Sequence, residues 1–153
     1  MPDLRIEPAG LGPVRVYVAD PRAQLIDRLA VLAESNEDLK LVGAQTSGFA
    51  AVTSVALAKP NVVLVGDYFP DADGLDVCDH IHRSSPKAAV IVVSDKRTDE
   101  ALLRAVEAGA CGVIAPVAPD EDLVAAILRA ADGELLMTRA TVHRLFRLSR
   151  DQR

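Results

Sequence analysis

Short apolar runs alternate along this chain with segments of helical periodicity. Residues 22–34 place Leu25, Leu29 and Leu32 on one helical face, and residues 120–132 carry an apolar stripe of the same 3.6-residue period. The run at 61–66 is wholly apolar apart from Asn61, which is typical of a strand covered on both faces. The pattern predicts strands at 14–19, 39–44, 61–66, 88–94 and 111–115. It predicts helices at 22–34, 48–59, 74–84, 98–108 and 120–132.

Five strands alternating with five helices predict an α/β fold with a doubly wound, five-stranded parallel sheet. Functional groups in such sheets gather beyond the carboxyl ends of the strands. The residues at those ends are therefore the first candidates for a site: Asp20, Gly66, Asp67, Ser94 and Pro116.

Composition narrows the class of protein. A chain of 153 residues, half of them hydrophobic and only 3% aromatic, can bury a core of Val, Leu, Ile and Ala. A net charge of −5 argues against a surface devoted to nucleic acid, and no apolar stretch has the length of a membrane span. Cys78 and Cys111 have neither redox nor metal spacing, and the N-terminus does not read as a secretory signal. We expect reduced thiols and a cytoplasmic protein.

The two ends of the chain differ from the middle. Residues 1–13 hold three prolines and two glycines, and we expect a flexible leader there. Residues 14–133 would form the main domain, and residues 134–153 a C-terminal linker helix. In that last segment, Thr138 suits a helix cap, and Val142, Leu145 and Phe146 would line one face. The favoured interpretation is a solvated helix docked on the body; the alternative is a partner-binding or linker helix leading to another domain.

A series of motifs in order carries a family resemblance: "VADP", "VGDYFPDADGL", "VIVVSD", "AGACGVIAP" and "DEDLVAAI". Together they resemble the receiver domain of response regulators, of the NarL/LuxR type. "GELLMTRATVHRLF" is similar to the segment that joins such receivers to a helix-turn-helix DNA-binding domain. The resemblance implies a flavodoxin-like (βα)5 fold with an extra C-terminal helix, and phosphoryl transfer from a histidine kinase to an aspartate in two-component signalling.

The resemblance also implies a set of site residues, and the match weakens there. The family's acidic pair after the first strand, which helps to bind Mg²⁺, falls on Ala19 and Asp20. The phosphate-accepting aspartate falls on Gly66, a placement fixed by Pro70 and Gly74 four and eight residues further on.

The remaining parts match unevenly. Ser94 matches the family's hydroxyl residue, whereas Pro116 falls where a lysine is expected. Val113 stands where the group often has a switching aromatic residue. Three of the five expected parts are therefore missing together.

The missing parts remove the chemistry of the phosphorylation cycle. Mg²⁺ and a lysine normally neutralise the phosphoryl oxygens, and Asp20 alone is a poor cage for the ion. Pro116 supplies neither a cation nor a backbone donor, and Gly66 has no nucleophile. We therefore expect no bound Mg²⁺, no cofactor and no aspartyl phosphorylation, with Asp20 as a weak metal candidate.

Two acidic residues have alternative interpretations. Asp67 is a possible shifted phosphoacceptor, but alternation along a strand predicts that it points away from the site unless the strand bends at Gly66. Asp20 is interpreted first as an N-cap, with Pro21 at the first helical position, and second as a residue for metal or charge recognition.

The leading hypothesis is an atypical, phosphorylation-independent receiver domain that controls transcription through homodimerisation or other protein contacts. Residues 98–108 and 120–132 are the candidate contact faces, as the resemblance implies. DNA would be bound only through a helix-turn-helix domain absent from this sequence. The alternatives are phosphorylation at Asp67, or a small molecule sensed in the crevice of Asp20, Gly66, Ser94 and Pro116. Enzyme activity is not expected, because no nucleotide-binding or catalytic motif is present.

Overall fold

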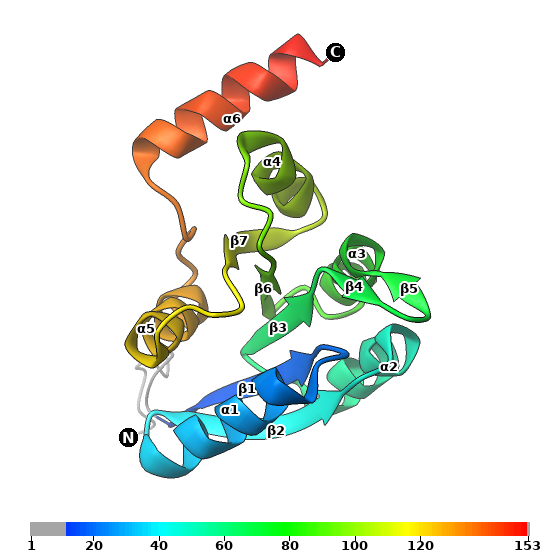
Figure 1. The fold of residues 1–153 in the computed structure, drawn as a ribbon, viewed down its shortest axis with the longest axis vertical. Helices are drawn as coiled ribbons and strands as arrows, with labels where there is room; N and C mark the ends of the chain where they lie inside the picture. Colours follow the sequence, from blue (N-terminus) through cyan, green and yellow to red (C-terminus); the bar gives the residue numbers. More distant parts are fainter. Residues whose placement is uncertain (1–11, 153) are drawn as a thin grey trace, which may run out of the picture.

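The computed structural model describes residues 12–152, and its centre is one parallel sheet of five strands in the order β2-β1-β3-β6-β7 (Figure 1). The five strands are β1 (Val14–Ala19), β2 (Leu39–Gln45), β3 (Val62–Gly66), β6 (Ala89–Val93) and β7 (Ala110–Ile114). Each end lies within one residue of its predicted position. A short antiparallel hairpin of β4 (Tyr68–Phe69) and β5 (Ala72–Asp73) follows β3 and was not predicted.

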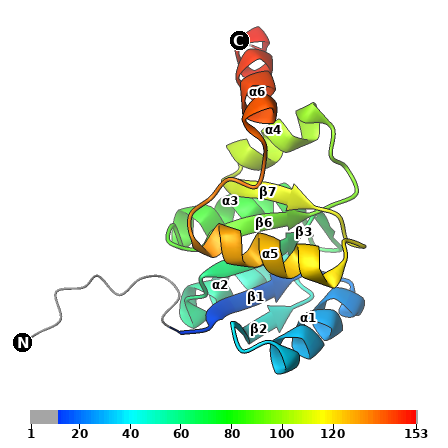
Figure 2. The ribbon, with the colours of Figure 1, turned by 90° about the vertical axis from the view of Figure 1, so that its left-hand side faces the viewer.

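Helices cover both faces of the sheet, as predicted (Figure 2). They are α1 (Ala23–Ser35), α2 (Gly48–Ala58), α3 (Gly74–Ser84), α4 (Asp99–Glu107) and α5 (Asp120–Ala131). Side chains of α1 and α5 pack on one face, and those of α2, α3 and α4 on the other. The doubly wound, flavodoxin-like fold is confirmed.

Alternation along β1 divides the core between the two faces. Val16 and Val18 contact the layer of α1 and α5, whereas Tyr17 and Ala19 contact the layer of α2 and α3. Because a strand's side chains alternate in direction, Asp20 continues on the α1 side. This places its carboxylate at the edge of the sheet beside the start of α1.

The sixth helix, α6 (Arg139–Asp151), packs on α4 at one end of the molecule (Figures 1 and 2). Thr138 caps it by accepting a hydrogen bond from Thr141 N, as predicted. Leu145 is buried, and Arg144 Nε donates to Asp99 Oδ2 at 3.0 Å. The predicted packing of Phe146 is wrong: its side chain is 69% exposed. Since α6 meets mainly one helix, a narrow stripe through Leu145 is enough to form that contact.

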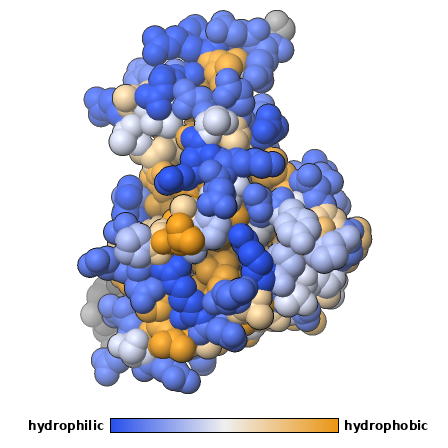
Figure 3. Space-filling model, in the orientation of Figure 1, coloured by the Kyte–Doolittle hydropathy of each residue, from blue (hydrophilic) through white to orange (hydrophobic). Residues whose placement is uncertain are grey.

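Other sequence predictions concern the chain ends and the surface. The leader predicted at residues 1–13 falls almost entirely outside the described residues. Cys78 is buried and Cys111 half-buried, and both are free thiols. Within residues 12–152, no helix combines the length and the apolar character needed to cross a lipid bilayer. The α6 end of the surface is mostly hydrophilic, with one compact hydrophobic patch (Figure 3).

Candidate functional site

The predicted site residues all lie at the carboxyl edge of the sheet, but they form separate groups. Asp20 and Gly66 lie together beside α1. Asp67 and Ser94 lie together on the side of α4. Pro116 belongs to the loop after β7, where it contacts an arginine of α1. Ala19 is buried in the core of the opposite face and does not join Asp20.

Asp20 is fully buried and its carboxylate is held by Arg22. Oδ1 accepts from Arg22 N at 2.7 Å and from Arg22 Nε at 2.9 Å, and Oδ2 accepts from Arg22 Nη2 at 2.8 Å. The hydrogen bonds from the Arg22 side chain to Asp20 are the main cause that raises the pKa of the guanidinium. The guanidinium therefore neutralises the one carboxylate that the sequence offers to a metal.

The predicted N-cap role of Asp20 is wrong. Helix α1 begins at Ala23, its N-cap is Arg22, and no side chain caps it. Asp20 instead closes an Asx turn onto the backbone N–H of Arg22, two residues ahead. Pro21 lies within this turn rather than at the first helical position.

The side of Gly66 on which a side chain would project faces the Asp20 carboxylate. A Cβ built on Gly66 would lie 2.6 Å from Asp20 Oδ2 and 3.4 Å from Pro21 Cδ. An aspartate at this position would thus add a second carboxylate directly beside a buried one, a strongly unfavourable pair without a bound cation. The close approach of Asp20 explains why only glycine fits here in this conformation.

The donor set does not fit a Mg²⁺ ion. Its one buried carboxylate, Asp20, already accepts three hydrogen bonds from Arg22, and Ala19 and Gly66 have no oxygen-bearing side chain. Residues 12–152 contain no group of three or more His, Cys, Asp or Glu side chains placed to hold a metal. Mg²⁺ requires near-octahedral oxygen coordination, which this arrangement does not offer.

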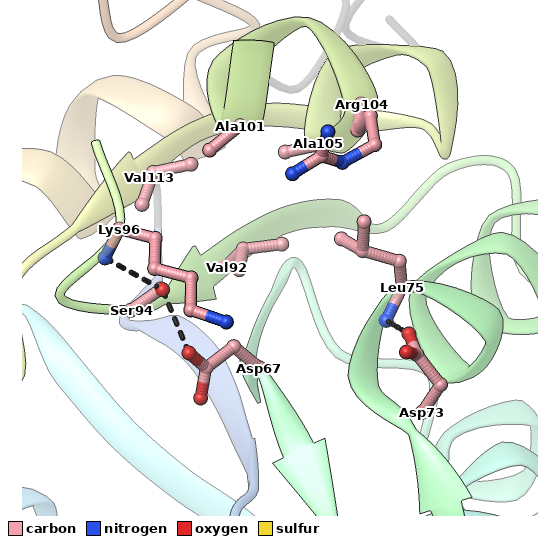
Figure 4. Close-up of a pocket in the computed structure, with 10 residues that line it drawn as sticks. All are labelled: Asp67, Asp73, Leu75, Val92, Ser94, Lys96, Ala101, Arg104, Ala105 and Val113. Atoms are coloured by element: carbon pink, nitrogen blue, oxygen red, sulfur yellow. Dashed lines mark hydrogen bonds between the residues drawn. The ribbon is translucent and has the colours of Figure 1, made fainter. Parts of the chain in front are cut away.

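Asp67 projects to the opposite side of the sheet from Gly66 and Asp20, as alternation along β3 predicts. Its Oδ2 accepts from Ser94 Oγ at 2.7 Å, and Ser94 Oγ in turn accepts from Lys96 N at 3.0 Å (Figure 4). Val63 and Val65 pack on the face of α2, α3 and α4, and Asp67 continues that series toward α4, where it meets Ser94. Ser94, predicted as the hydroxyl of the site, is thus a partner of Asp67 rather than of Gly66.

A cavity of about 160 Å³ opens beside Asp67, beneath α4. Its apolar wall consists of small or medium side chains, among them Val92, Ala105 and Val113. Lys96 extends over Ser94 toward Asp67, and Arg104 projects from α4 at the opposite rim (Figure 4). Neither cation forms an ion pair within the described part of the chain. Arg104 was missed by the sequence reasoning, because nothing distinguishes it from a solvated helix residue.

The loop of Pro116 is held by Arg28 of α1. Arg28 Nη1 donates to Pro116 O at 3.2 Å, Nη2 donates to Ala118 O, and Nε donates to Asp120 Oδ1 at 2.7 Å. A guanidinium from α1 thus contacts the loop on which the resemblance places a lysine. No sequence signal connects Arg28 with this loop, because the partners lie about 90 residues apart.

Comparison with known proteins decides the family. The family described as the response regulator receiver domain matches residues 16–128, which include all five strands except the first two residues of β1. The chain belongs to the response regulator receiver family. The predicted resemblance is therefore confirmed.

Related sequences agree with a receiver of two-component systems. The receiver is 26% identical over 124 residues to the DNA-binding transcriptional activator DevR/DosR of Mycobacterium tuberculosis, covering 81% of the chain and 57% of that relative. It is 23% identical over 132 residues to the uncharacterised transcriptional regulatory protein YxjL of Bacillus subtilis, covering 86% of the chain and 61% of that relative. The receiver thus spans about six-tenths of the length of these relatives.

Solved structures agree on the fold. The signal receiver domain of the response regulator NarL from Mycobacterium tuberculosis superposes with a TM-score of 0.74 at 23% identity, covering 80% of this chain and 99% of that one. A LuxR-family two-component response regulator from Aurantimonas gives a TM-score of 0.76 at 19% identity, covering 90% and 98%. At these identities the likeness concerns the receiver fold.

Proposed function

We propose that this receiver domain regulates transcription without aspartyl phosphorylation and acts through protein contacts, with homodimerisation as the main one. Relatives named as transcriptional regulators support the output, and they extend beyond the length that this chain spans. We further propose that residues 14–133 act as the receiver and residues 134–153 as a linker. DNA contact would belong to a helix-turn-helix domain outside this sequence.

One observation supports the proposal most strongly: Gly66, at the acceptor position, faces the Asp20 carboxylate, which is already paired with Arg22. Gly66 supplies no nucleophile, and the space of its side chain ends 2.6 Å from Asp20 Oδ2. Since Arg22 already compensates the buried charge of Asp20, this site has no uncompensated charge for a phosphoryl group or a metal ion to balance.

Incubation with acetyl phosphate and Mg²⁺, followed by intact mass measurement, tests the proposal. We expect no stoichiometric phosphate adduct on the wild type. The Asp67→Asn variant is the matched control, because Asp67 is the carboxylate nearest to the family's hydroxyl residue, Ser94. An adduct on the wild type that disappears in this variant would establish the shifted acceptor and overturn the proposal.

A second candidate function, ligand sensing, is favoured by the cavity beside Asp67. Lys96 and Arg104 line it together with the carboxylates of Asp67 and Asp73, and neither cation forms an ion pair with any residue from 12 to 152. Val113 leaves space where a larger aromatic residue would fill it. A small organic anion with a short apolar group fits this lining. Isovalerate is a suitable probe, with isopentylamine as a control of similar shape and opposite charge.

Titration followed by amide NMR shifts tests this second function. We expect isovalerate, and not the amine, to shift residues around Ser94, and an Arg104→Met/Lys96→Met double variant to lose the effect. The filling variant Val113→Phe should lose it as well, without removing a charge. Equal shifts with both probes, or unchanged shifts in the variants, would exclude anion sensing at this cavity.

A further inference from the structure

The placement of the few aromatic residues marks two surfaces. The chain has only two Tyr and three Phe, and three of these five are exposed: Phe49 at 68%, Tyr68 at 59% and Phe146 at 69%. An exposed aromatic side chain marks a candidate interaction surface where it lies together with other apolar or complementary charged groups. Phe146 lies on α6, and the other two lie near the start of α2 and on β4.

The first surface is a basic stripe on the outer side of α6. It consists of His143, Phe146, Arg147 and Arg150, which follow helical spacing and line one shallow depression. Arg147 and Arg150 form no ion pair with any described residue. The opposite side of α6 is already fixed to α4 through Leu145 and Arg144, so the basic stripe is held facing away from the domain.

The second surface is an acidic groove between α2 and α3, of about 450 Å³. Val52 and Val77 give its lining an apolar part, beside the exposed Phe49. The polar part of the lining includes the acids Asp71, Asp73 and Asp76, together with His80. None of the three acids forms an ion pair within residues 12–152. Tyr68 pairs with Asp73 in the β4–β5 hairpin, so it adds a second exposed aromatic residue, after Phe49, to this region.

The two surfaces complement each other in charge and shape. A helix with one aromatic anchor and flanking arginines fits a groove lined by apolar and acidic side chains. Aromatic and arginine side chains are also the residues that dominate binding energy in interfaces. Within one chain they cannot meet, because α6 lies beyond α4, at the end of the molecule away from α2 (Figures 1 and 2).

We infer that the basic stripe of α6 docks into the acidic α2–α3 groove of a second copy of this chain. In a closed two-fold pair, each copy gives its stripe and receives the other's, so the contact forms twice. This inference rests on the proposed function, since it names the surface through which the receiver would dimerise.

The contact faces predicted from sequence are less suited to this role. The exposed large apolar residues among residues 12–152 include none on α4 or α5. Helix α4 is in addition partly covered by α6. We therefore place the interface not on α4 and α5 but on the basic stripe and the acidic groove, which carry the exposed aromatic residues.

Charge exchange between the two surfaces tests the inference by sedimentation equilibrium. Arg147→Asp and Asp76→Arg each reverse one side, and the double variant restores the pairing with exchanged signs. Asp76 is chosen because Asp71 and Asp73 accept hydrogen bonds from the first backbone N–H groups of α2 and α3, whereas the Asp76 carboxylate accepts none from residues 12–152. Arg97→Asp and Glu37→Arg, both exposed positions elsewhere on the surface, are the matched controls.

We expect each single reversal to weaken dimerisation at least about tenfold, and the double variant to return within about threefold of wild type. Phe146→Ala should weaken it by a similar factor, and the two control variants should leave it unchanged.

Other outcomes overturn the inference in distinguishable ways. A dimer indifferent to the reversals, or weakened by each but not restored in the double variant, would refute this interface and leave the proposed function standing. A wild type that stays monomeric at about 100 µM would refute both the interface and dimerisation as the output. Absence of aspartyl phosphorylation is tested separately by the mass measurement.

Discussion

Replacing Arg22 with methionine leaves the buried Asp20 carboxylate with only one of its three hydrogen bonds. The lost donors are Nε at 2.9 Å and Nη2 at 2.8 Å, and the backbone N–H at 2.7 Å remains. Removing one partner of a buried ion pair costs about 3–5 kcal/mol, because the other charge stays buried and unpaired.

Partial exposure of Arg22 makes the expected cost smaller than about 3–5 kcal/mol. The Arg22 side chain is 38% exposed, so water can replace part of its interaction with Asp20 once the guanidinium is gone. We therefore expect Arg22→Met to lower the free energy of unfolding by about 2 kcal/mol, or Tm by about 4–8 °C.

Urea denaturation of a double-mutant cycle isolates the pair. Asp20→Asn alone removes the charge and keeps the shape, and the combination with Arg22→Met should cost less than the sum of the two by about 1 kcal/mol or more. Arg83→Met is the matched control, because Arg83 pairs with Asp79 on the surface of α3 and its loss should cost under about 0.5 kcal/mol.

Two results would contradict a neutralised Asp20–Arg22 pair. If Arg22→Met destabilised the protein no more than Arg83→Met, the guanidinium would not be the group that makes a buried Asp20 tolerable. If the cycle showed no coupling, Asp20 and Arg22 would contribute independently, and the internal neutralisation of the carboxylate would be wrong.

Three further predictions concern other parts of the molecule. Gly66→Asp should cost about 2 kcal/mol or more in urea denaturation, because its Cβ alone would lie 2.6 Å from Asp20 Oδ2. Burial raises the pKa of the Cys78 thiol to about 12, so it should react slowly with thiol reagents at pH 8 until urea unfolds the protein. Since the unfolded thiol loses its proton near its ordinary value of 9.0 and the native one does not, this group should make stability fall as pH rises above that value. Leu145→Ala should speed hydrogen exchange throughout α6, whereas Phe146→Ala should leave exchange in the monomer unchanged.

Each of these has a contrary outcome. A stable Gly66→Asp variant that also accepts phosphate would show that the space beside Asp20 opens readily. Rapid thiol labelling of Cys78 in the native protein would contradict its burial. Equal exchange rates in the Leu145 and Phe146 variants would mean that α6 does not dock on α4 through Leu145.

The repeating parts of the fold could be predicted from the sequence because period and burial go together. The wholly apolar run of β3 and the stripe of α5 report contacts made along a whole element, so their ends were predicted within one residue. The small β4–β5 hairpin was not predicted, because two-residue strands have no period.

The site could be predicted only in part, since its contacts depend on how elements meet. Gly66 and Asp20 were expected at one edge of the sheet, and they lie together there. The direction of Asp67, away from Gly66, follows from strand alternation, whereas its hydrogen bond to Ser94 depends on how β3 and β6 meet. Arg28 reaches a loop about 90 residues away, a contact that spacing along the chain cannot reveal. Arg22 had a usable signal: an Asp followed by Pro and Arg can close an Asx turn.

Two arginines, one at the N-cap of α1 and one within it, hold the chain after β1 and after β7. Arg22 at the N-terminus of α1 neutralises the carboxylate after β1, and Arg28 one and a half turns later holds the loop after β7. In the phosphorylation chemistry of the family, Mg²⁺ binds at the carboxylates after β1 and a lysine projects from the end of β7, and both contact the phosphoryl group. Here we propose that both positions are satisfied by guanidiniums built into the fold, so neither can report the arrival of phosphate. A signal that changes this receiver must therefore act on groups that α1 leaves unsatisfied, and two such regions are the cation-rimmed cavity beneath α4 and the basic stripe that α4 holds outward.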